Sequence, residues 1–269
     1  MTATLPARAA QPDYGIDAPV VVRNLAVVGL VLLAISLASF AGWLPPMLAL
    51  HLLGRATVRV PIRANALVVA LAFVGTAAWM YLGSRYGKIV ERERLLSHIA
   101  WTGHERVLDV GCGRGLLLVG AGRRLTDGTA TGVDIWQAED LSGNRPDVPL
   151  MNAQLEGVGD RVAVRTADMR ALPFLDASFD VVVSRAAIHN LYSADDRAAA
   201  IREIARVLKP GGMAVIADIR HHNGYARTFA ENGCGDVRLM DSRLFEALCT
   251  LLTIGSLRPN TMLVAKPRA

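Results

Sequence analysis

Three aspartates stand at or beside the ends of three successive strand-like segments. Asp109 lies in the apolar run "RVLDV" just before the glycine-rich turn 111–115, Asp134 closes "TATGVD", and Asp168 follows "RVAVRT". A carboxylate beside a glycine turn repels a polyphosphate and attracts a cation, and glycines let the backbone pass close under a ligand. Asp134 is placed to accept hydrogen bonds from a ribose diol, and Asp168 from an adenine amino group. The pattern predicts a site for a cationic adenosine derivative.

Any one of these aspartates is equally well explained as a loop residue or a helix cap, because aspartate is favoured at both. Three of them on successive strands of one sheet favour a ligand. S-adenosylmethionine matches this site, since it carries an ammonium and a sulfonium and no phosphate. Leu116 stands where a dinucleotide fingerprint has its third glycine, and a nicotinamide oxidoreductase therefore remains only as an alternative.

The elements that must position these residues alternate between strand and helix. A doubly wound, mostly parallel sheet is the expected fold, and ligands bind such sheets at the carboxyl ends of the strands. Strands are expected at 106–110, 129–135, 161–168, 179–185, 213–219, near 236–240 and at 261–265. Helices are expected at 115–125, from 194 to a Pro-Gly-Gly stop at 210–212, and at 224–233.

Five segments resemble, in order and spacing, the motifs of class I S-adenosylmethionine-dependent methyltransferases. They are "VLDVGCGRG", "GVDI", "DMRALPF", "FDVVVSRAAIHN" and "REIARVLKPGG". The similarity covers roughly residues 90–269 and is closest to the small-molecule branch that includes quinone-biosynthesis enzymes. It implies a seven-stranded Rossmann-like sheet and S-adenosyl-L-methionine as the cofactor.

The resemblance also assigns cofactor-binding residues. It places Asp109 and the three glycines of the turn at the methionine part, Asp134 at the ribose and Ile135 beside the adenine. It places Asp168 and Met169 at the adenine edge, and Ser184 near the methionine carboxylate or sulfonium. The glycines are Gly111, Gly113 and Gly115.

The acceptor side has weaker candidates. Methyl transfer needs mainly alignment of acceptor and methyl, and a base is required only when the acceptor must lose a proton. The segment "SRAAIHNLY" offers Arg185, His189, Asn190 and Tyr192, of which His189 is the best candidate for a base or positioning group. A structural histidine explains His189 equally well, and the adjacent pair 221–222 does not make a metal site.

Two segments depart from a bare family core. The stretch 136–158 is long and is expected to bring Trp136, Glu139 or Asp140 over the ligand. The apolar stretch 243–259 is either a core helix or a face that meets the membrane. Cys112, Cys234 and Cys249 form no ligand cluster, so we expect no metal and a reduced compartment.

The first third of the chain has a different character. Residues 24–54 and 64–84 contain no Asp, Glu, Lys or Arg, and each run is long enough to cross a bilayer as a helix. A cleaved signal peptide ending near "SFA" and a pair of buried helices in a soluble bundle are the alternatives. Two membrane helices, at about 25–44 and 64–84, are the preferred interpretation.

Charge supports this division. Residues 1–94 hold nine Lys and Arg against four Asp and Glu, whereas the rest of the chain holds 20 of each. The excess of positive charge in residues 1–94 favours membrane lipids as partners. A nucleic-acid-binding protein would be expected to carry its positive charge on the domain that has the glycine turn, which is neutral. Six cationic residues flank the helix pair outside and three lie in the connecting loop, so both ends are expected in the cytosol.

The expected organisation is therefore a cytosolic tail (1–23), a membrane anchor (24–84), a linker helix (85–104) and a methyltransferase domain (105–269). The expected protein is an integral, multi-pass cell-membrane methyltransferase acting on a small-molecule or lipid acceptor, or on a membrane protein. A membrane-tethered S-adenosylmethionine-binding regulatory or scaffolding module without turnover, and an aminopropyl transferase, are the alternatives.

Overall fold

The computed structural model describes residues 11–52, 56–137, 141–240 and 259–268, and it divides the chain into two units. One unit contains Met1–Gly15, Lys88–Ala138 and Gly143–Ala269. The other contains Ile16–Gly87 and Glu139–Ser142. We call them the sheet unit and the helical-hairpin unit.

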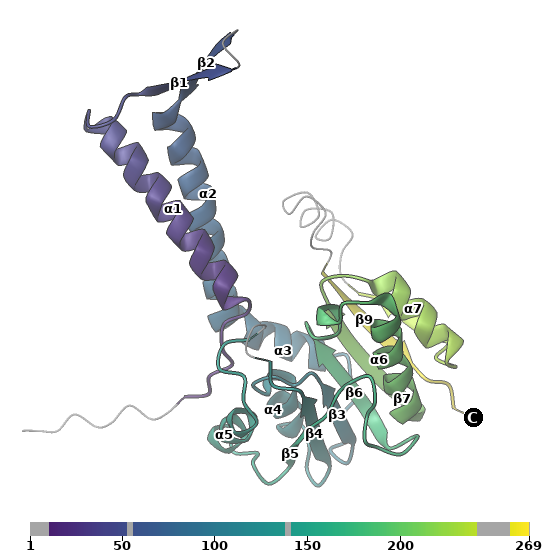
Figure 1. The fold of residues 1–269 in the computed structure, drawn as a ribbon. Helices are drawn as coiled ribbons and strands as arrows, with labels where there is room; N and C mark the ends of the chain where they lie inside the picture. Colours follow the sequence, from purple (N-terminus) through teal and green to yellow (C-terminus); the bar gives the residue numbers. More distant parts are fainter. Residues whose placement is uncertain (1–10, 53–55, 138–140, 241–258, 269) are drawn as a thin grey trace, which may run out of the picture. The chain divides into compact units, whose positions relative to one another are not determined.

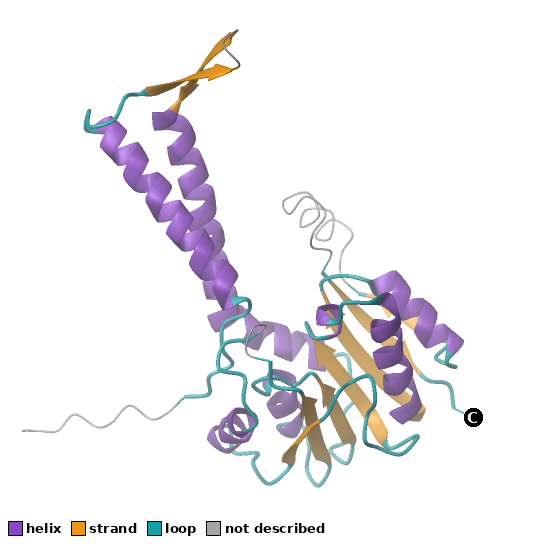
Figure 2. Ribbon diagram, viewed as in Figure 1, coloured by secondary structure: helices purple, strands orange, loops and turns teal. Residues whose placement is uncertain are grey.

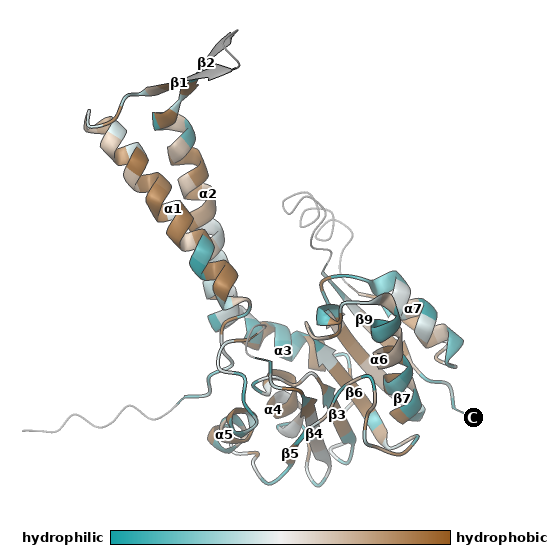
Figure 3. Cartoon of the chain, viewed as in Figure 1, coloured by the Kyte–Doolittle hydropathy of each residue, from teal (hydrophilic) through white to brown (hydrophobic). Residues whose placement is uncertain are grey.

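The helical-hairpin unit is built on two long apolar helices, α1 (Pro19–Phe40) and α2 (Ile62–Leu82), coloured largely brown in Figure 3. Between them β1 (Met47–Leu52) and β2 (Ala56–Pro61) pair antiparallel. Both helices are long and apolar enough to cross a membrane by length and composition. Only 11% and 17% of their most apolar stretches are buried, unlike core helices of a soluble protein.

Small residues let α1 and α2 approach closely. Gly29 lies against α2 so tightly that an added Cβ would stand 2.8 Å from Val74 Cγ2. At the other end of α1, Ser36 Oγ donates to the Arg63 carbonyl at 2.9 Å, and the Arg63 guanidinium donates to the Ser39 carbonyl at 2.8 Å. Small interfacial residues and hydroxyl hydrogen bonds are typical of paired helices in membranes. The residues buried along the two helices are Gly29, Ser36, Ser39, Ala66, Ala70 and Ala77.

The helix bounds differ from the sequence expectation. α1 begins at Pro19, about six residues earlier than expected, because proline at the first helical position needs no hydrogen-bond partner for its nitrogen. It ends at Phe40 rather than near residue 44, and Ala41 closes it by donating to Leu37 O. The backbone of the connecting segment forms an antiparallel β-hairpin.

A seven-stranded sheet organises the other unit, with the order β5-β4-β3-β6-β7-β9-β8. Its strands are orange in Figure 2. The first five strands in this order are parallel, and β9 runs antiparallel to both β7 and β8. The predicted doubly wound, mostly parallel sheet is confirmed. The strand bounds are β3 Arg106–Val110, β4 Thr129–Asp134, β5 Val162–Thr166, β6 Phe179–Arg185, β7 Leu208–Asp218, β8 Asp236–Leu239 and β9 Asn260–Ala265.

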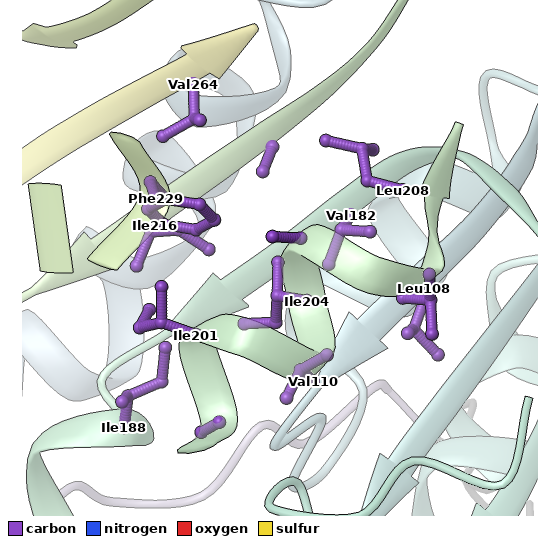
Figure 4. Close-up of a cluster of buried hydrophobic side chains, with 14 of the residues drawn as sticks. Leu108, Val110, Val182, Ile188, Ile201, Ile204, Leu208, Ile216, Phe229 and Val264 are labelled. Carbon is purple, nitrogen blue, oxygen red and sulfur yellow. The ribbon is translucent and has the colours of Figure 1, made fainter. Parts of the chain in front are cut away.

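Two buried clusters lie on the two faces of this sheet because successive strand residues point to opposite sides. In β6, Val181 and Val183 belong to one cluster and Val182 to the other. The cluster in Figure 4 packs Leu108 and Val182 of the strands against Ile204 and other side chains of the covering helices. Apolar side chains on both faces explain why β3 and β6 read as continuous hydrophobic runs.

The helices divide between the two faces (Figure 1). One cluster includes side chains of α6 (Ala194–Val207) and α7 (His222–Glu231). The other includes side chains of α3, α4 and α5. The bounds of the remaining helical elements are η1 Gly83–Gly87, α3 Lys88–Leu96, α4 Leu116–Gly122, α5 Asp147–Leu155 and η2 Ile188–Asn190.

α6 shows how local chemistry sets an element's ends. Ser193 caps its first turn by accepting the Asp196 N–H at 2.9 Å. The helix ends at Val207, shortly before the Pro-Gly-Gly stop that the sequence predicts. Leu208 already has extended backbone, with a ψ of 128°, and begins β7. The apolar stretch 243–259 lies almost wholly outside the described residues, apart from Pro259.

Candidate functional site

The parallel strands bring the predicted carboxylates to one edge of the sheet. Asp109 is the penultimate residue of β3, Asp134 the last of β4, and Asp168 follows the end of β5 by two residues. Register pairs Asp109 with Gly132 of β4 and with Val183 of β6. The carboxyl ends of β3, β4, β5, β6 and β7 therefore share the edge where ligands bind such sheets.

The glycine turn is required by protein packing as well as by close approach of a ligand. Gly111 has a φ of +71°, and a Cβ added there would stand 2.3 Å from Ala187 Cβ in the segment after β6. Gly115 has a φ of +84°, and its added Cβ would stand 2.8 Å from Pro149 Cβ. A side chain at either glycine would strain the backbone and collide with a neighbour. The Gly111 contact also places the turn directly against the segment that carries His189.

Asp109 is buried beneath the turn, not exposed at its surface. Its carboxylate accepts the Leu118 N–H at 2.8 Å, so it anchors the start of α4. Burial raises the pKa of this carboxyl to about 8, and the nearby charge of Asp134 adds to that shift. Without a cation nearby, the neutral form therefore prevails at pH 7.

Asp134 faces the turn and the loop that follows β4. One of its oxygens accepts the Gly113 N–H at 2.8 Å. The other accepts the Trp136 N–H at 2.6 Å and the Asn144 side-chain amide at 3.2 Å. Ile135, predicted beside the adenine, is exposed, so an apolar surface is open next to this carboxylate.

Asp168 makes an ion pair with a residue of its own loop. Arg170 contacts both carboxylate oxygens and also reaches Asp196, at 2.9 Å. The hydrogen bonds from Arg170 lower the pKa of Asp168. Met169 points back toward the glycine turn, where its Cε would lie 3.5 Å from a Cβ added at Gly111. The side chains of Asp168 and Met169 therefore face in different directions.

Ser184 is turned into the protein. Its hydroxyl donates to the Val110 carbonyl at 2.8 Å, and the residue is 1% exposed. The contact ties the end of β6 to the end of β3, so Ser184 supports the glycine turn from below.

His189 lies on the predicted acceptor side of the same edge and is held by a residue that the sequence analysis missed. Its Nδ1 lies 2.5 Å from a carboxylate oxygen of Asp218, the last residue of β7, and its backbone N–H donates to the other oxygen at 3.1 Å. Tyr225 donates its hydroxyl to Asp218 at 3.1 Å. Among the described residues nothing bonds to His189 Nε2. This arrangement fixes the imidazole and leaves one nitrogen available.

Asp218 could have been found from the sequence. It ends "MAVIAD" as Asp134 ends "TATGVD", and an acid at a strand's carboxyl end is the signal used for the other three. Burial, followed by the charge and hydrogen bond of Asp218, raises the pKa of Tyr225, which therefore remains a donor. Among the described residues, Asp218 is the only ion-pair partner of His189.

The other acceptor-side candidates are arranged differently. Arg185 pairs with Glu91 of α3 at 2.7 Å, and Asn190 is half-buried. Tyr192 is fully exposed. The structure therefore brings His189, but not Tyr192, into a buried polar group.

The two histidines after β7 differ from each other. His222 is buried, with Nε2 within 3.2 Å of the Asp218 and Asn260 carbonyls. The pKa of His221 is lowered by burial and then by Arg197 and Arg220. Within the described ranges no group of three or more His, Cys, Asp or Glu side chains could hold a metal ion.

The loop after β4 is described only in part. Trp136 has a φ of +63° and donates its indole N–H to Thr166 Oγ1 at 2.8 Å, across the ends of β4 and β5. Glu139 and Asp140 lie outside the described residues. Cys112, buried in the glycine turn, has its pKa raised, chiefly by burial, so its thiol stays protonated.

Comparison with known proteins agrees with this geometry. Residues 108–216 match the family model of the methyltransferase domain. The chain carries a class I S-adenosylmethionine-dependent methyltransferase domain. The predicted family and the cofactor, S-adenosylmethionine, are thereby confirmed.

Two curated relatives of the methyltransferase domain are similar over part of their length. Methyltransferase GfsG of Streptomyces halstedii is 37% identical over 127 residues, which are 47% of this chain and 42% of the relative. The demethylmenaquinone methyltransferase of Roseiflexus castenholzii is 35% identical over 115 residues, 42% of each protein. The chain spans less than half of the length of either relative.

Solved structures share the fold of the domain. A geranyl diphosphate C-methyltransferase from Streptomyces coelicolor A3(2) superimposes with a TM-score of 0.52 at 18% identity, covering 72% of this chain and 84% of that one. The YcgJ protein of Bacillus subtilis gives a TM-score of 0.52 at 18% identity, covering 67% of this chain and 99% of that one.

The residues present fit the cofactor. Asp109 lies beneath the glycine turn and Asp134 faces it, an arrangement of carboxylates that suits a cation and a diol, and Ile135 offers an exposed apolar side chain next to Asp134. Arg114, the one cation within the turn, is directed to Asp13 at 2.7 Å.

Proposed function

We propose that the protein is a membrane-anchored methyltransferase that methylates a hydroxyl group of a lipophilic small molecule. The observation that carries this proposal is the His189–Asp218 pair at the edge that also carries the glycine turn. A base held ready at the acceptor side suits an acceptor that must lose a proton, as a hydroxyl does.

The proton transfer follows from the hydrogen bonds of His189. Asp218 accepts from Nδ1, which selects the tautomer with a lone pair on Nε2. His189 Nε2 takes the proton of the acceptor hydroxyl, and Asp218 stabilises the imidazolium that results. When bound, the cofactor supplies an electrophilic methyl group. The side chain of Asp218 is 1% exposed, so its charge acts with little screening by water.

Alignment is the second contribution of the domain. The contact of Gly111 with Ala187 fixes the glycine turn against the chain two residues before His189. Donor and acceptor loops held in one packed unit reduce the orientational freedom that the reactants must lose, which is the main source of acceleration in such a displacement.

Anchoring in a membrane is supported by the apolar surface of α1 and α2. Leu30, Leu37, Leu71 and Trp79 are all more than half exposed. A continuous apolar surface of this kind is costly in water and suits lipid. The cationic residues outside the helix pair outnumber those inside its loop, which supports a domain that faces the cytosol.

A lipophilic acceptor is favoured because an anchored domain meets lipid-dissolved molecules at high local concentration. The similarity to a demethylmenaquinone methyltransferase, whose name describes a quinone substrate, supports a lipophilic acceptor. A membrane protein as acceptor, and a binding module without turnover, are the competing functions.

A transfer assay with the full-length protein tests the proposal. Purified protein in detergent is incubated with methyl-labelled S-adenosylmethionine and a lipid extract from a strain that lacks the gene, and the label is followed into organic solvent. We expect label in the lipid fraction as a base-stable ether. Asp218→Asn should reduce the rate about 100-fold or more, since the histidine then loses its orienting charge.

Three outcomes would contradict the proposal. Label in protein indicates a protein acceptor, and label on carbon or nitrogen removes the need for a hydroxyl. Saturable cofactor binding with no transfer to any fraction indicates a binding module.

A further inference from the structure

The residues just before α1 form part of the methyltransferase domain. We call Asp13, Tyr14 and Gly15 the strap. Tyr14 is buried, its hydroxyl donates to Glu156, and Arg92 donates to the same hydroxyl at 3.2 Å. Arg92 also bonds Glu156 at 2.9 Å. Burial, followed by the hydrogen bond to Glu156, raises the pKa of Tyr14, so the phenol keeps its proton.

Two buried cations depend in part on the strap. Lys88 donates from Nζ to the carbonyls of Tyr14 and Gly15, both at 3.0 Å. Lys88 and the Arg92 side chain are each 3% exposed. A buried charge that loses a partner is strongly unfavourable, so these residues hold the strap in place rather than leaving it as a loose tail.

Asp13 is bonded on several sides. Its N–H donates to Asn152 Oδ1 at 3.0 Å, and its carbonyl accepts from Asn152 Nδ2 at 3.0 Å and from Arg114 Nε at 2.8 Å. Its carboxylate accepts from Arg114 Nη2 at 2.7 Å. The backbone of Asp13 therefore bonds to both Arg114 and Asn152, and its carboxylate bonds to Arg114.

Arg114 belongs to the glycine turn, between Gly113 and Gly115, which makes this contact relevant to the cofactor. Asn152 Nδ2 donates to the Arg114 carbonyl at 2.9 Å, so one amide joins the strap and the turn. From the other side, Asp134 holds the Gly113 N–H at 2.8 Å. The turn is thus fixed between a strand end on one side and the strap on the other.

We propose that the strap is a positioning element for the glycine turn, and that Asp13 sets cofactor affinity through Arg114. The proposal rests on the proposed function only in its choice of ligand. Glycine-rich backbone has many accessible conformations, and fixing the turn before binding removes an entropic cost from the binding step. The strap precedes the helix pair in the sequence, so a form of the domain that begins after the helix pair would lack it.

The test uses full-length protein in detergent with S-adenosylhomocysteine as the probe. Asp13→Asn removes the charge while keeping the backbone bonds, and we expect a rise in Kd of about threefold to fivefold by calorimetry. Tyr14→Phe removes the hydroxyl and keeps the ring, and it should also raise the Kd.

Asp236→Asn is the matched control. Asp236 pairs with Arg238 at 2.7 Å and its side chain is 51% exposed, against 2.7 Å and 55% for Asp13 with Arg114. It lies on β8, at the opposite end of the sheet order from β5. The Kd of Asp236→Asn for S-adenosylhomocysteine should equal that of the wild type.

Hydrogen exchange separates positioning from general stability and does not depend on the cofactor. In Asp13→Asn, the amides of residues 113–115 should exchange faster while those of β6 are unchanged. Equal exchange at the turn in wild type and variant overturns the strap proposal, whatever the Kd. If the wild-type protein shows no saturable binding of S-adenosylhomocysteine by calorimetry, the cofactor assignment is overturned instead. In that case Arg114→Gln should still make the amides of residues 113–115 exchange faster than in the wild type.

Discussion

The cofactor side and the acceptor side of the sheet edge are built in different ways. On the cofactor side, Asp109 and Asp134 bond to N–H groups of residues within 21 positions in the sequence. On the acceptor side, His189 and Asp218 lie 29 positions apart, on segments that follow or end neighbouring strands. The bonds of Asp109 and Asp134 therefore stay within β3, the glycine turn, α4 and β4, whereas the His189–Asp218 pair joins the segment after β6 to the end of β7.

The state of the polar groups also differs. The carboxylate of Asp109 and the hydroxyl of Ser184 are buried and bonded to the protein's own backbone. His189 has one nitrogen bonded and the other directed to no described residue. This contrast predicts that changes on the cofactor side act on binding and stability, and that changes on the acceptor side act on rate.

The largest effect is expected for His189→Ala. Loss of the base should lower kcat by about 10²- to 10⁴-fold, with the cofactor Kd unchanged. Rates of label transfer and calorimetric Kd values test this. His104→Ala is the control, because His104 also pairs with an aspartate, Asp127, but is 66% exposed and precedes β3. A kcat within threefold of the wild type in His189→Ala would show that no base acts there.

Asp109→Asn should have the next largest effect, on the cofactor side. The amide oxygen can still accept the Leu118 N–H, so the fold should be retained, but the charge available to a cation is lost. We expect Kd for S-adenosylmethionine to rise about 10- to 100-fold. An unchanged Kd would contradict the role that the family resemblance assigns to Asp109.

The pH dependence of stability follows from the same residue. Its pKa rises from 3.8 to about 8 on folding, so the folded state binds one more proton between these values. The stabilisation is fully present below about pH 4 and is lost as pH rises through about 8. The free energy of unfolding should fall by up to about 1.4 kcal/mol per pH unit in that window. The difference between the wild-type and Asp109→Asn curves of unfolding free energy against pH isolates the contribution of Asp109. Parallel curves would show that Asp109 makes no such contribution.

The smallest effect is expected for Ser193→Ala. The helix α6 loses the acceptor for the Asp196 N–H, at a cost of about 1 kcal/mol of stability. Thermal unfolding measures this loss, and cofactor Kd should not change because α6 follows the acceptor segment. A weakened Kd would show that the two sides of the edge are more tightly coupled than their contacts indicate.

Much of the fold could be predicted from local pattern. Apolar runs predicted the strands β3, β4 and β6 nearly to the residue, because strands buried on both faces leave a continuous hydrophobic signal. Charge-free runs likewise located α1 and α2, because each run is long enough to form one continuous apolar helix. The ends of α1 were less accurate, because caps and prolines at single positions decide them.

The site was predicted less completely. The turn residues and His189 were found, and their roles in binding and catalysis remain predictions. Asp218 was missed although its signal was present, and Asp13 had no signal at all, since it lies 101 positions from Arg114.

By itself, the sequence determined the class of the domain, the strands that carry its carboxylates and the apolar helix pair. These features depend on residues close together in the chain, where spacing and side-chain type are sufficient. Only the tertiary structure decided that Asp218 orients His189, that Ser184 and Asp109 point inward, and that Asp13 bonds the glycine turn. Such contacts join segments whose separation in the sequence has no fixed relation to their distance in space, so no local pattern records them.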